Sequence, residues 1–458
     1  MKQKFSHAKQ YVAQLKSIEM QIDRNQLQDA AMQLNVLVKT AANDPRLFLL
    51  GSRLAEAAKN PAAMLLSAHK AHELAPQWPV ASIHLAEVLA SQYETEKAMA
   101  MAEQAVQQAL TQSSIDIELL TKAAAVAHRA NQHTRAMQWL REAEQVDPGD
   151  VSVRYKIGLM LADSGQDKEA IDIFTELLRL RPSNQALLIA RMRAYLNLNQ
   201  AEEARADGNV LMTLEPDSET YQFYLDIAHG RTPATQPASV VTGLFDGYAV
   251  GFDQHVVGQL HYKLPRDVAA MINQWHPDRQ GDVLDLGCGT GLLGLCLGPI
   301  KGVLVGVDLS AQMIAEANLH RVYDSFHQVN VLDALRATPE SLYHVISALD
   351  VFIYVGRLNT VVPDAYRILV GGGRFVFSCE AGLDQGPDYA LQRSYRYSHQ
   401  RAYVLRLLGE AGFGEIDVVE RVLRLEAGEP VHGFLVTARK PVATVKKSSP
   451  RKRTPKTE

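Results

Sequence analysis

The chain has 458 residues, of which 47% are hydrophobic and 21% are charged. This composition supports sizeable cores and excludes wholesale disorder, and the length is that of about three average domains. The three cysteines are too few for a disulfide framework and form no CxxC pair, which argues against a cysteine-rich zinc site. The net charge is −4, which argues against broad capture of nucleic acid phosphates.

The two ends of the chain differ in charge from its body. The first residues, MKQKFSHAKQ, are charged where a secretory signal would be apolar, and the most apolar stretch, 291–307, is rich in glycine and interrupted by Lys301. We therefore expect no signal peptide, no membrane-spanning segment and a cytoplasmic location. Residues 439–458 contain eight Lys or Arg and one acidic residue, so only the tail is basic.

The N-terminal half repeats with a period of 34 residues. Pro148, Pro182 and Pro216 follow apolar helical stretches at this spacing, and an alanine stands twelve residues before each of them. Two antiparallel helices that cross closely need small residues at the crossing, and a proline stops the second helix. The pattern predicts about six helical hairpins between Ser6 and roughly His229.

The middle copy carries the most specific pattern. Gly158, Ala170, Phe174 and Pro182 stand where tetratricopeptide repeats place small, small, aromatic and proline residues. The region resembles this family, which implies an all-α solenoid whose concave face binds a peptide or protein partner. A structural spacer or a dimerisation module is the alternative.

Two details of the repeats lead to further expectations. Ala98 and Ala136 are 38 residues apart rather than 34, so we expect the extra residues in the loop around 111–116. Basic residues on the first helices, such as Arg154 and Arg191, suit either a clamp for an acidic peptide or a solvated face, and we favour the solvated face.

The composition changes after the repeats. Residues 231–239, RTPATQPAS, are polar, contain two prolines and continue no helical period, which indicates a domain boundary. We predict a repeat domain at 1–230, a linker at 231–243, a second domain at 244–440 and a basic disordered tail at 441–458. The tail suits either contact with nucleic acid or a solubilising role, and we favour the second.

The second domain contains a glycine turn between two strands. Residues 282–291 read DVLDLGCGTG, in which a short strand, Val283–Leu286, leads into the turn and a helix at Leu292–Leu297. A second strand, Val303–Val307, ends in Asp308. This order is the nucleotide-binding half of a doubly wound sheet. The glycines let the backbone approach a ligand, and the acid can accept hydrogen bonds from ribose hydroxyls.

Two ligand classes compete for this turn. Residues 289–294 match GxGxxG, so a nicotinamide dinucleotide is one of them. That frame starts two residues after the strand, however, and the frame from Gly287 has Leu292 at the third glycine position. A carboxylate at Asp285 would repel a pyrophosphate, whereas S-adenosylmethionine carries an ammonium and a sulfonium and no phosphate. These points favour S-adenosylmethionine.

The sequence VLDLGCGTG followed by GVDLS resembles the signature of Rossmann-fold S-adenosylmethionine-dependent methyltransferases. Residues 244–265 are similar to the lead-in of predicted methyltransferases that carry N-terminal tetratricopeptide repeats. The resemblance implies that Asp285 faces the methionine ammonium and that Asp308 holds the ribose. It also implies that Gly287, Gly289 and Gly291 line the cofactor, that Asp333 accepts from the adenine amino group, and that Asp350 lies where substrate and methyl group meet. A surface or helix-capping role is the alternative for each aspartate.

The predicted fold is multidomain, with an all-α repeat solenoid followed by an α/β doubly wound, Rossmann-like sheet of seven strands with an antiparallel edge. A lid helix is expected at Phe245–His261, where Tyr248 and Phe252 either close over the cofactor or pack on the sheet. The later strands are expected at 344–349, 415–425 and 431–439, with a helix near 399–412. A turn that begins at Gly372 and a further strand that ends at Glu380 are expected between the first two of these strands.

Methyl transfer depends mainly on positioning and desolvation, and a base is needed only where the acceptor must lose a proton. The sequence shows no catalytic constellation and no metal-ligand cluster. Residues 350–354, DVFIY, differ from the Pro-Pro box of enzymes that methylate amide or base nitrogens, and Cys379 lacks the context of a cytosine-C5 nucleophile. Four residues are candidates for the substrate pocket, with a structural role as the alternative: Tyr354, Tyr395, Tyr397 and His399.

We therefore predict a cytoplasmic S-adenosylmethionine-dependent methyltransferase with an unidentified acceptor, whose repeats recruit a protein partner or substrate. A catalytically inactive scaffold that binds the same cofactor is the first alternative, and an NAD-dependent oxidoreductase is the second. We expect no membrane partner and no nucleic acid signal apart from the tail.

Overall fold

The computed structural model describes residues 9–246, 262–426 and 429–442. The chain divides into two compact units, Met1–Arg231 and Thr232–Glu458. The predicted basic tail, apart from its first two residues, lies outside the described residues, as do Tyr248 and Phe252.

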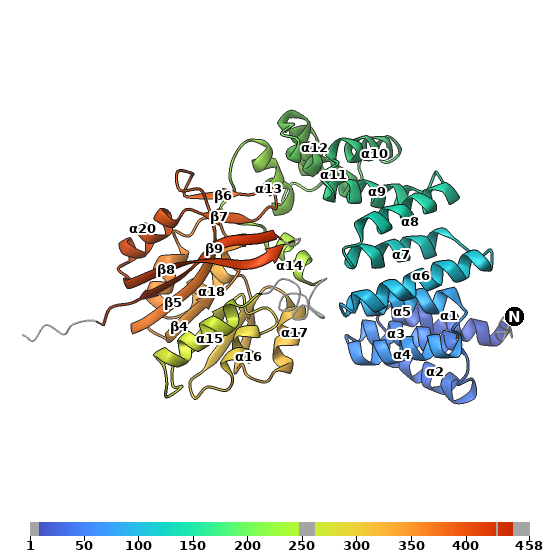
Figure 1. Ribbon diagram of the computed structural model, residues 1–458, viewed down its shortest axis with the longest axis horizontal. Coiled ribbons are helices and arrows are strands. Elements are labelled where there is room, and N and C mark those ends of the chain that lie inside the picture. The colour runs from blue at the N-terminus through green and yellow to red at the C-terminus, as the bar shows by residue number, and fades with distance from the viewer. Residues whose placement is uncertain (1–8, 247–261, 427–428, 443–458) are drawn as a thin grey trace, which may run out of the picture. The chain divides into compact units, whose positions relative to one another are not determined.

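The first unit is a succession of antiparallel helices, each packed against the next (Figure 1). The helices are α1 (Lys9–Asp23), α2 (Leu27–Thr40), α3 (Pro45–Ala57), α4 (Pro61–Leu74), α5 (Pro79–Ser91), α6 (Thr95–Thr111), α7 (Ile117–Arg129), α8 (His133–Val146), α9 (Val151–Asp163), α10 (Asp167–Leu180), α11 (Gln185–Asn197), α12 (Ala201–Leu214) and α13 (Glu219–Ala228). Six pairs, α1 to α12, match the expected hairpins, and α13 follows as a single helix.

Small residues lie where the paired helices cross. Gly158 in α9 faces Phe174 in α10 so closely that a Cβ at Gly158 would lie 2.5 Å from the Phe174 ring. Short polar side chains begin the first helices: Asp150 and Asn184 each accept a hydrogen bond from the backbone N–H three residues along. The small residues of the 34-residue pattern therefore lie where the helices of these hairpins pack together.

The longer step between Ala98 and Ala136 arises differently from what the spacing predicts. Helix α6 has 17 residues, whereas α4, α8, α10 and α12 each have 14. Most of the extra length is therefore helix rather than loop. Additional helical turns satisfy their own backbone hydrogen bonds, whereas added loop residues would need other partners.

The two arginines considered for a peptide clamp are held within the unit. Arg191 donates two hydrogen bonds to Asp207, at 2.9 and 2.6 Å, and a third to Thr175. Arg154 pairs with Glu176. Each guanidinium is paired with a carboxylate on the following helix, so these arginines tie neighbouring helices together.

The second unit contains a twisted sheet of nine strands within its described residues (Figure 1). The strands are β1 (Val283–Leu286), β2 (Leu304–Asp308), β3 (Ser325–Gln328), β4 (Tyr343–Ala348), β5 (Leu369–Ala381), β6 (Tyr389–Leu391), β7 (Tyr397–His399), β8 (Gly414–Glu426) and β9 (Glu429–Arg439). Their order is β3-β2-β1-β4-β5-β7-β6, with β9 antiparallel to β5 and β8 paired to β9. The two short strands β6 and β7 add to the seven expected. Three-residue strands carry too little hydrophobic period to be found in a sequence.

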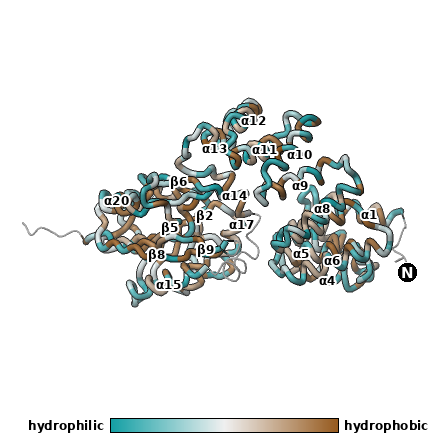
Figure 2. The backbone as a smooth tube through the Cα atoms, turned by 45° about the horizontal axis from the view of Figure 1, so that its top comes forward, coloured by the Kyte–Doolittle hydropathy of each residue, from teal (hydrophilic) through white to brown (hydrophobic). Residues whose placement is uncertain are grey.

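Helices cover this sheet: α14 (Ala238–Asp246), α15 (Leu264–Trp275), α16 (Leu292–Leu297), α17 (Ala311–Leu319), α18 (Val331–Ala337), α19 (Val361–Ile368) and α20 (Arg401–Ala411). The strands β1, β2, β4 and β5 run parallel, and β1 lies between β2 and β4. Hydrophobic segments, brown in Figure 2, run through this unit, and its core includes Phe352, Phe375 and Phe377, which are fully buried.

The predicted linker 231–243 is largely part of the second unit's fold. The N–H of Gln236 donates to the Tyr354 carbonyl at 3.0 Å, and the Tyr397 hydroxyl donates to the Pro233 carbonyl at 3.0 Å. Helix α14 then begins at Ala238. The residues before α14 lack a helical period, and hydrogen bonds to Tyr354 and Tyr397, distant in the chain, hold them in place.

Candidate functional site

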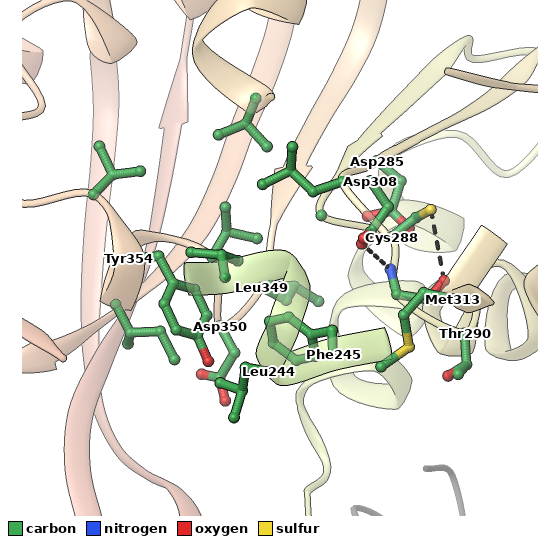
Figure 3. Close-up of a pocket in the computed structure, with 18 of the residues that line it drawn as sticks. Leu244, Phe245, Asp285, Cys288, Thr290, Asp308, Met313, Leu349, Asp350 and Tyr354 are labelled. Carbon is green, nitrogen blue, oxygen red and sulfur yellow. Dashed lines mark hydrogen bonds between the residues drawn. The ribbon is translucent and has the colours of Figure 1, made fainter. Parts of the chain in front are cut away.

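A cavity of about 390 Å³ opens at the carboxyl ends of β1, β2 and β4. Its walls are the glycine turn after β1, the end of β2, the start of α18, the segment after β4, and residues of the 233–246 segment. Figure 3 shows Asp285 and Asp308 at one end of this cavity and Asp350 and Tyr354 at the other. In open α/β sheets this edge, where the strand order reverses, is where ligands bind.

The turn after β1 adopts a backbone that only glycine takes up readily. Gly287, Gly289 and Gly291 have φ values of +64°, +53° and +83°. A Cβ at Gly287 would lie 2.4 Å from Val351, whereas a Cβ at Gly289 would have nothing within 4 Å. Gly287 is therefore required by packing, and Gly289 leaves the turn open toward the cavity. All three predicted glycines belong to this turn, and Gly287 and Gly289 line the cavity. Gly291, which was also predicted to line the cofactor, does not line the cavity and instead precedes α16 as its cap.

Asp308 lies at the end of β2, where the strand pattern places it, and it lines the cavity. Its carboxylate accepts hydrogen bonds from the N–H groups of Gly289, at 2.8 Å, and Ser310, at 2.9 Å. These bonds tie the glycine turn to the second strand.

Asp285 lines the same end of the cavity and is only 3% exposed. Its oxygens accept from the hydroxyls of Tyr323, at 2.7 Å, and Ser347, at 2.8 Å. Burial raises its pKa to about 6; the two hydroxyls act in the opposite direction, and the neighbouring Asp308 adds to the rise. A cation in the cavity would favour the ionised form, which fits a ligand ammonium placed there.

Asp333 does not lie where its predicted role requires. It is in the first turn of α18, exposed, does not line the cavity and pairs with Arg336 at 3.1 Å. Asn330, the cap of this helix, lines the cavity instead, with Val331. The sequence prediction chose the acidic residue, but the helix begins at Val331 and carries Asp333 to its outer face. A prediction that looked for the helix cap would have found Asn330.

Asp350 follows β4 and lines the opposite end of the cavity. Its φ is +56°, an unusual value for a residue other than glycine, and its N–H donates to the Ser378 hydroxyl at 2.8 Å. Arg424, from β8, donates to Asp350 at 3.0 Å and also to Glu380. Sequence reasoning missed Arg424 because β8 and β4 are distant in the chain.

The wall at this end is apolar and aromatic. Leu244 and Phe245 of α14 line the cavity, and the Phe245 ring packs edge-to-face on Tyr354 with 5.6 Å between the ring centroids. Tyr354, one of the four candidate pocket residues, lies in the turn Phe352–Tyr354. Residues 247–261 of the predicted lid helix lie outside the described residues, and its first residue, Phe245, lines one side of the cavity.

The other three candidates do not line the cavity. His399 is fully buried and its Nε2 bonds to the carbonyls of Val355 and Gly356. Burial lowers the pKa of His399 to about 4, so it is neutral at physiological pH. Tyr395 and Tyr397 bond through a carbonyl or hydroxyl to the 233–246 segment. These residues support the wall rather than face a ligand.

Across the described ranges, no group of three or more His, Cys, Asp or Glu is arranged to hold a metal ion. In the same residues, no helix combines the length and hydrophobicity that crossing a bilayer requires.

Comparisons with known proteins agree with this geometry. Residues 284–375, which run from β1 into β5, match the family model of a methyltransferase domain, and residues 151–184, which span α9 and α10, match that of a tetratricopeptide repeat. The chain contains a methyltransferase domain. It follows a tetratricopeptide repeat region, as the sequence patterns indicate.

Curated relatives of the methyltransferase domain include two enzymes named ubiquinone biosynthesis O-methyltransferase. The one from Pseudomonas savastanoi is 27% identical over 125 residues, which are 26% of this chain and 53% of the relative. The one from Nitrosomonas europaea is 30% identical over 131 residues, 28% of this chain and 52% of the relative. The chain thus spans about half the length of the curated relatives it matches.

Solved structures that are similar include magnesium protoporphyrin IX methyltransferase from Synechocystis with bound S-adenosylmethionine, at 19% identity and a TM-score of 0.35, covering 46% of this chain and all of that one. The tetratricopeptide repeat protein YrrB has 18% identity and a TM-score of 0.35, and the match covers 43% of this chain and 97% of that one.

Proposed function

We propose that the second unit binds S-adenosylmethionine in this cavity and transfers its methyl group to an acceptor. The observation that carries the proposal is the convergence of an open glycine turn with the carboxylates Asp285 and Asp308 at the carboxyl edge of β1 and β2. The two arginines of the cavity, Arg396 and Arg424, are paired with carboxylates. The cavity therefore suits a ligand with positive groups better than a pyrophosphate.

The chain's residues would act by binding and by excluding water. S-adenosylmethionine supplies a methyl group on a positively charged sulfur, so the acceptor needs only to be aligned with it. The glycine turn would hold the methionine portion, Asp308 the ribose and the Asn330 region the adenine. The apolar wall of Leu244, Phe245 and Tyr354 would remove water from the reacting atoms.

A direct test compares ligand binding with methyl incorporation. Calorimetry of the full chain should show saturable binding of S-adenosylhomocysteine and none of NADH. Incubation of a cell extract with the chain and radiolabelled S-adenosylmethionine should place label on a protein or a small molecule. Tight NADH binding without S-adenosylhomocysteine binding would overturn the proposal, and binding without label in any fraction would favour an inactive scaffold.

We further propose that the repeats recruit a protein partner, which the repeat match and the stacked hairpins support. Lys156 is exposed on α9, the first helix of the matched repeat, and Lys168 is exposed on α10, the second. Charge reversal Lys156→Glu should reduce labelling of a protein substrate severalfold, whereas Lys168→Glu should not. If both variants reduced labelling equally, the first helices of the repeats would not be the surface that binds the protein substrate. Cofactor affinity should be unchanged in both variants.

A cytoplasmic location is also proposed. The chain's three cysteines are free, with Cys288 and Cys379 buried, which agrees with a reducing compartment. Fractionation of cells that produce the tagged chain would test this.

A further inference from the structure

The sheet order determines which end of the cavity receives which part of the cofactor. This argument rests on the proposed function. Asp308, at the end of β2, would hold the ribose, and Asn330 lies beyond it, after β3. The adenine therefore extends toward β3, and the sulfur and methionine extend the other way, across β1 toward β4. Asp350, directly after β4, stands at that sulfur end, opposite Asp308 in the cavity (Figure 3).

A cluster of buried charges surrounds Asp350. The Arg424 side chain is 5% exposed, Glu380 is 11% exposed and Asp350 is 20% exposed. Arg424 donates to Asp350 Oδ2 at 3.0 Å through one terminal nitrogen and to Glu380 through the other. The three groups come from β8, from the end of β5 and from the turn after β4. One guanidinium is thus shared between two carboxylates.

The surrounding charges leave this cluster with an excess of negative charge. Glu426, about half exposed, pairs with Arg396 and lies 3.8 Å from Arg424, so this second pair adds no net charge. Two tyrosine hydroxyls that interact electrostatically with the cluster, those of Tyr262 and Tyr354, are neutral, because burial and the carboxylate of Asp350 raise the pKa of both. Two carboxylates and one guanidinium in a poorly hydrated place cost free energy unless a cation approaches.

The carboxylate of Asp350 also has an unsatisfied oxygen. Its Oδ1 is buried and has no hydrogen-bond partner among the described residues. Asp350 is further held at a positive φ of 56°. Buried unpaired acceptors and strained backbone persist where the surrounding structure enforces them, and they concentrate at ligand sites.

We propose that Asp350, held in place by Arg424 and Glu380, selects the positively charged sulfonium of S-adenosylmethionine over the neutral thioether of S-adenosylhomocysteine. Asp350 supplies the attraction, and Arg424 is a positioning residue. Transfer of the methyl group removes the positive charge from the sulfur. The carboxylate of Asp350 then no longer attracts it, so S-adenosylhomocysteine is held less tightly than S-adenosylmethionine. The site would thereby favour cofactor exchange after each turnover.

Calorimetry with the full chain tests this without knowledge of the acceptor. The measured quantity is the ratio of the dissociation constants for S-adenosylhomocysteine and S-adenosylmethionine. Asp350→Asn, which keeps the size of the side chain, should lower this ratio about tenfold by weakening S-adenosylmethionine binding. Glu380→Gln should lower it by a smaller factor. Arg424→Gln, which removes the guanidinium that positions Asp350, should also lower it.

Two controls separate this charge effect from general damage. Asp308→Asn should weaken both ligands by the same factor, because the ribose is common to both. Asp364→Asn, on α19 and paired with Arg367, should change neither constant. Should Asp350→Asn fail to fold, Glu380→Gln provides the same readout.

The possible failures are distinguishable. If the unaltered chain binds neither compound, the proposed function is wrong and the inference falls with it. If the chain binds both compounds and the ratio is the same in Asp350→Asn and Glu380→Gln as in the unaltered chain, the proposed function stands and the charge selection by Asp350 is wrong.

Discussion

Two glycines, one in each unit, serve opposite purposes. Gly158 lies within helix α9, where the space that a Cβ would occupy is filled by Phe174. Gly289 lies in the turn after β1 at a φ of +53°, where that space is empty. The first glycine permits two helices of the repeat region to touch, and the second keeps a cavity open. A glycine alone therefore does not indicate a ligand, but its surroundings do.

The largest expected effect is at the open turn. Gly289→Arg places a long cation in the cavity and requires a positive φ of a non-glycine residue, so S-adenosylmethionine binding should weaken by more than about 100-fold. Calorimetry measures the affinity, and circular dichroism follows the helices of the repeats. Those helices should melt as in the unaltered chain. Affinity within a few-fold of normal would contradict the placement of the cofactor at this turn.

A change at the packed glycine, Gly158, should lower the stability of the repeats rather than the affinity for the cofactor. Gly158→Ala brings a methyl group 2.5 Å from the Phe174 ring, and the overpacking should destabilise the repeats by about 1–3 kcal/mol. The matched control is Gly409→Ala, in helix α20, where nothing lies within 4 Å; it should be neutral or stabilising by up to about 1 kcal/mol. Denaturant melts measure both. A stabilised Gly158→Ala variant would show that the crossing is looser than described.

The pH dependence of cofactor binding tests whether the carboxylate of Asp285 faces the ligand. The pKa of Asp285 is raised to about 6, so this group is largely neutral at pH 5 and ionised at pH 7. Affinity for S-adenosylmethionine should rise by up to about tenfold between these values, because only the ionised form attracts the ligand ammonium.

The variant Asp285→Asn should lose most of this pH dependence. Because the raised pKa belongs to the folded state, the contribution of Asp285 to folding stability should fall as pH rises from about 4 to 6. A pH profile that is the same in both proteins would assign the titration to another group.

The smallest expected effect is at Asp333. Because this residue is exposed on α18 and outside the cavity, Asp333→Asn should change S-adenosylmethionine affinity by less than about twofold. Asn330→Leu, which alters the residue that lines the cavity, should weaken it more. A loss of affinity in Asp333→Asn comparable to that of Asp308→Asn would restore the original assignment of adenine binding.

The parts of the site that were predicted from sequence share one property. Strand β1, the glycine turn and Asp308 lie within about thirty residues, and local backbone chemistry determines their arrangement. Arg424 and the cavity-lining residues among 233–243 were missed. Both reach the cavity by pairing with residues distant in the chain, and no local pattern records such pairing. Asp333 was misplaced because one turn of helix decides which face a residue occupies.

The sequence by itself determined the helical period, the strand–turn–strand unit and the order of the two units, because hydrophobic spacing, proline and glycine act through neighbouring residues. Only the tertiary structure decided that Asp350, Arg424 and Glu380 meet, that Asn330 rather than Asp333 faces the cavity, and that Gln236 belongs to its wall. These are contacts between distant strands and turns, and their geometry depends on how the whole sheet packs.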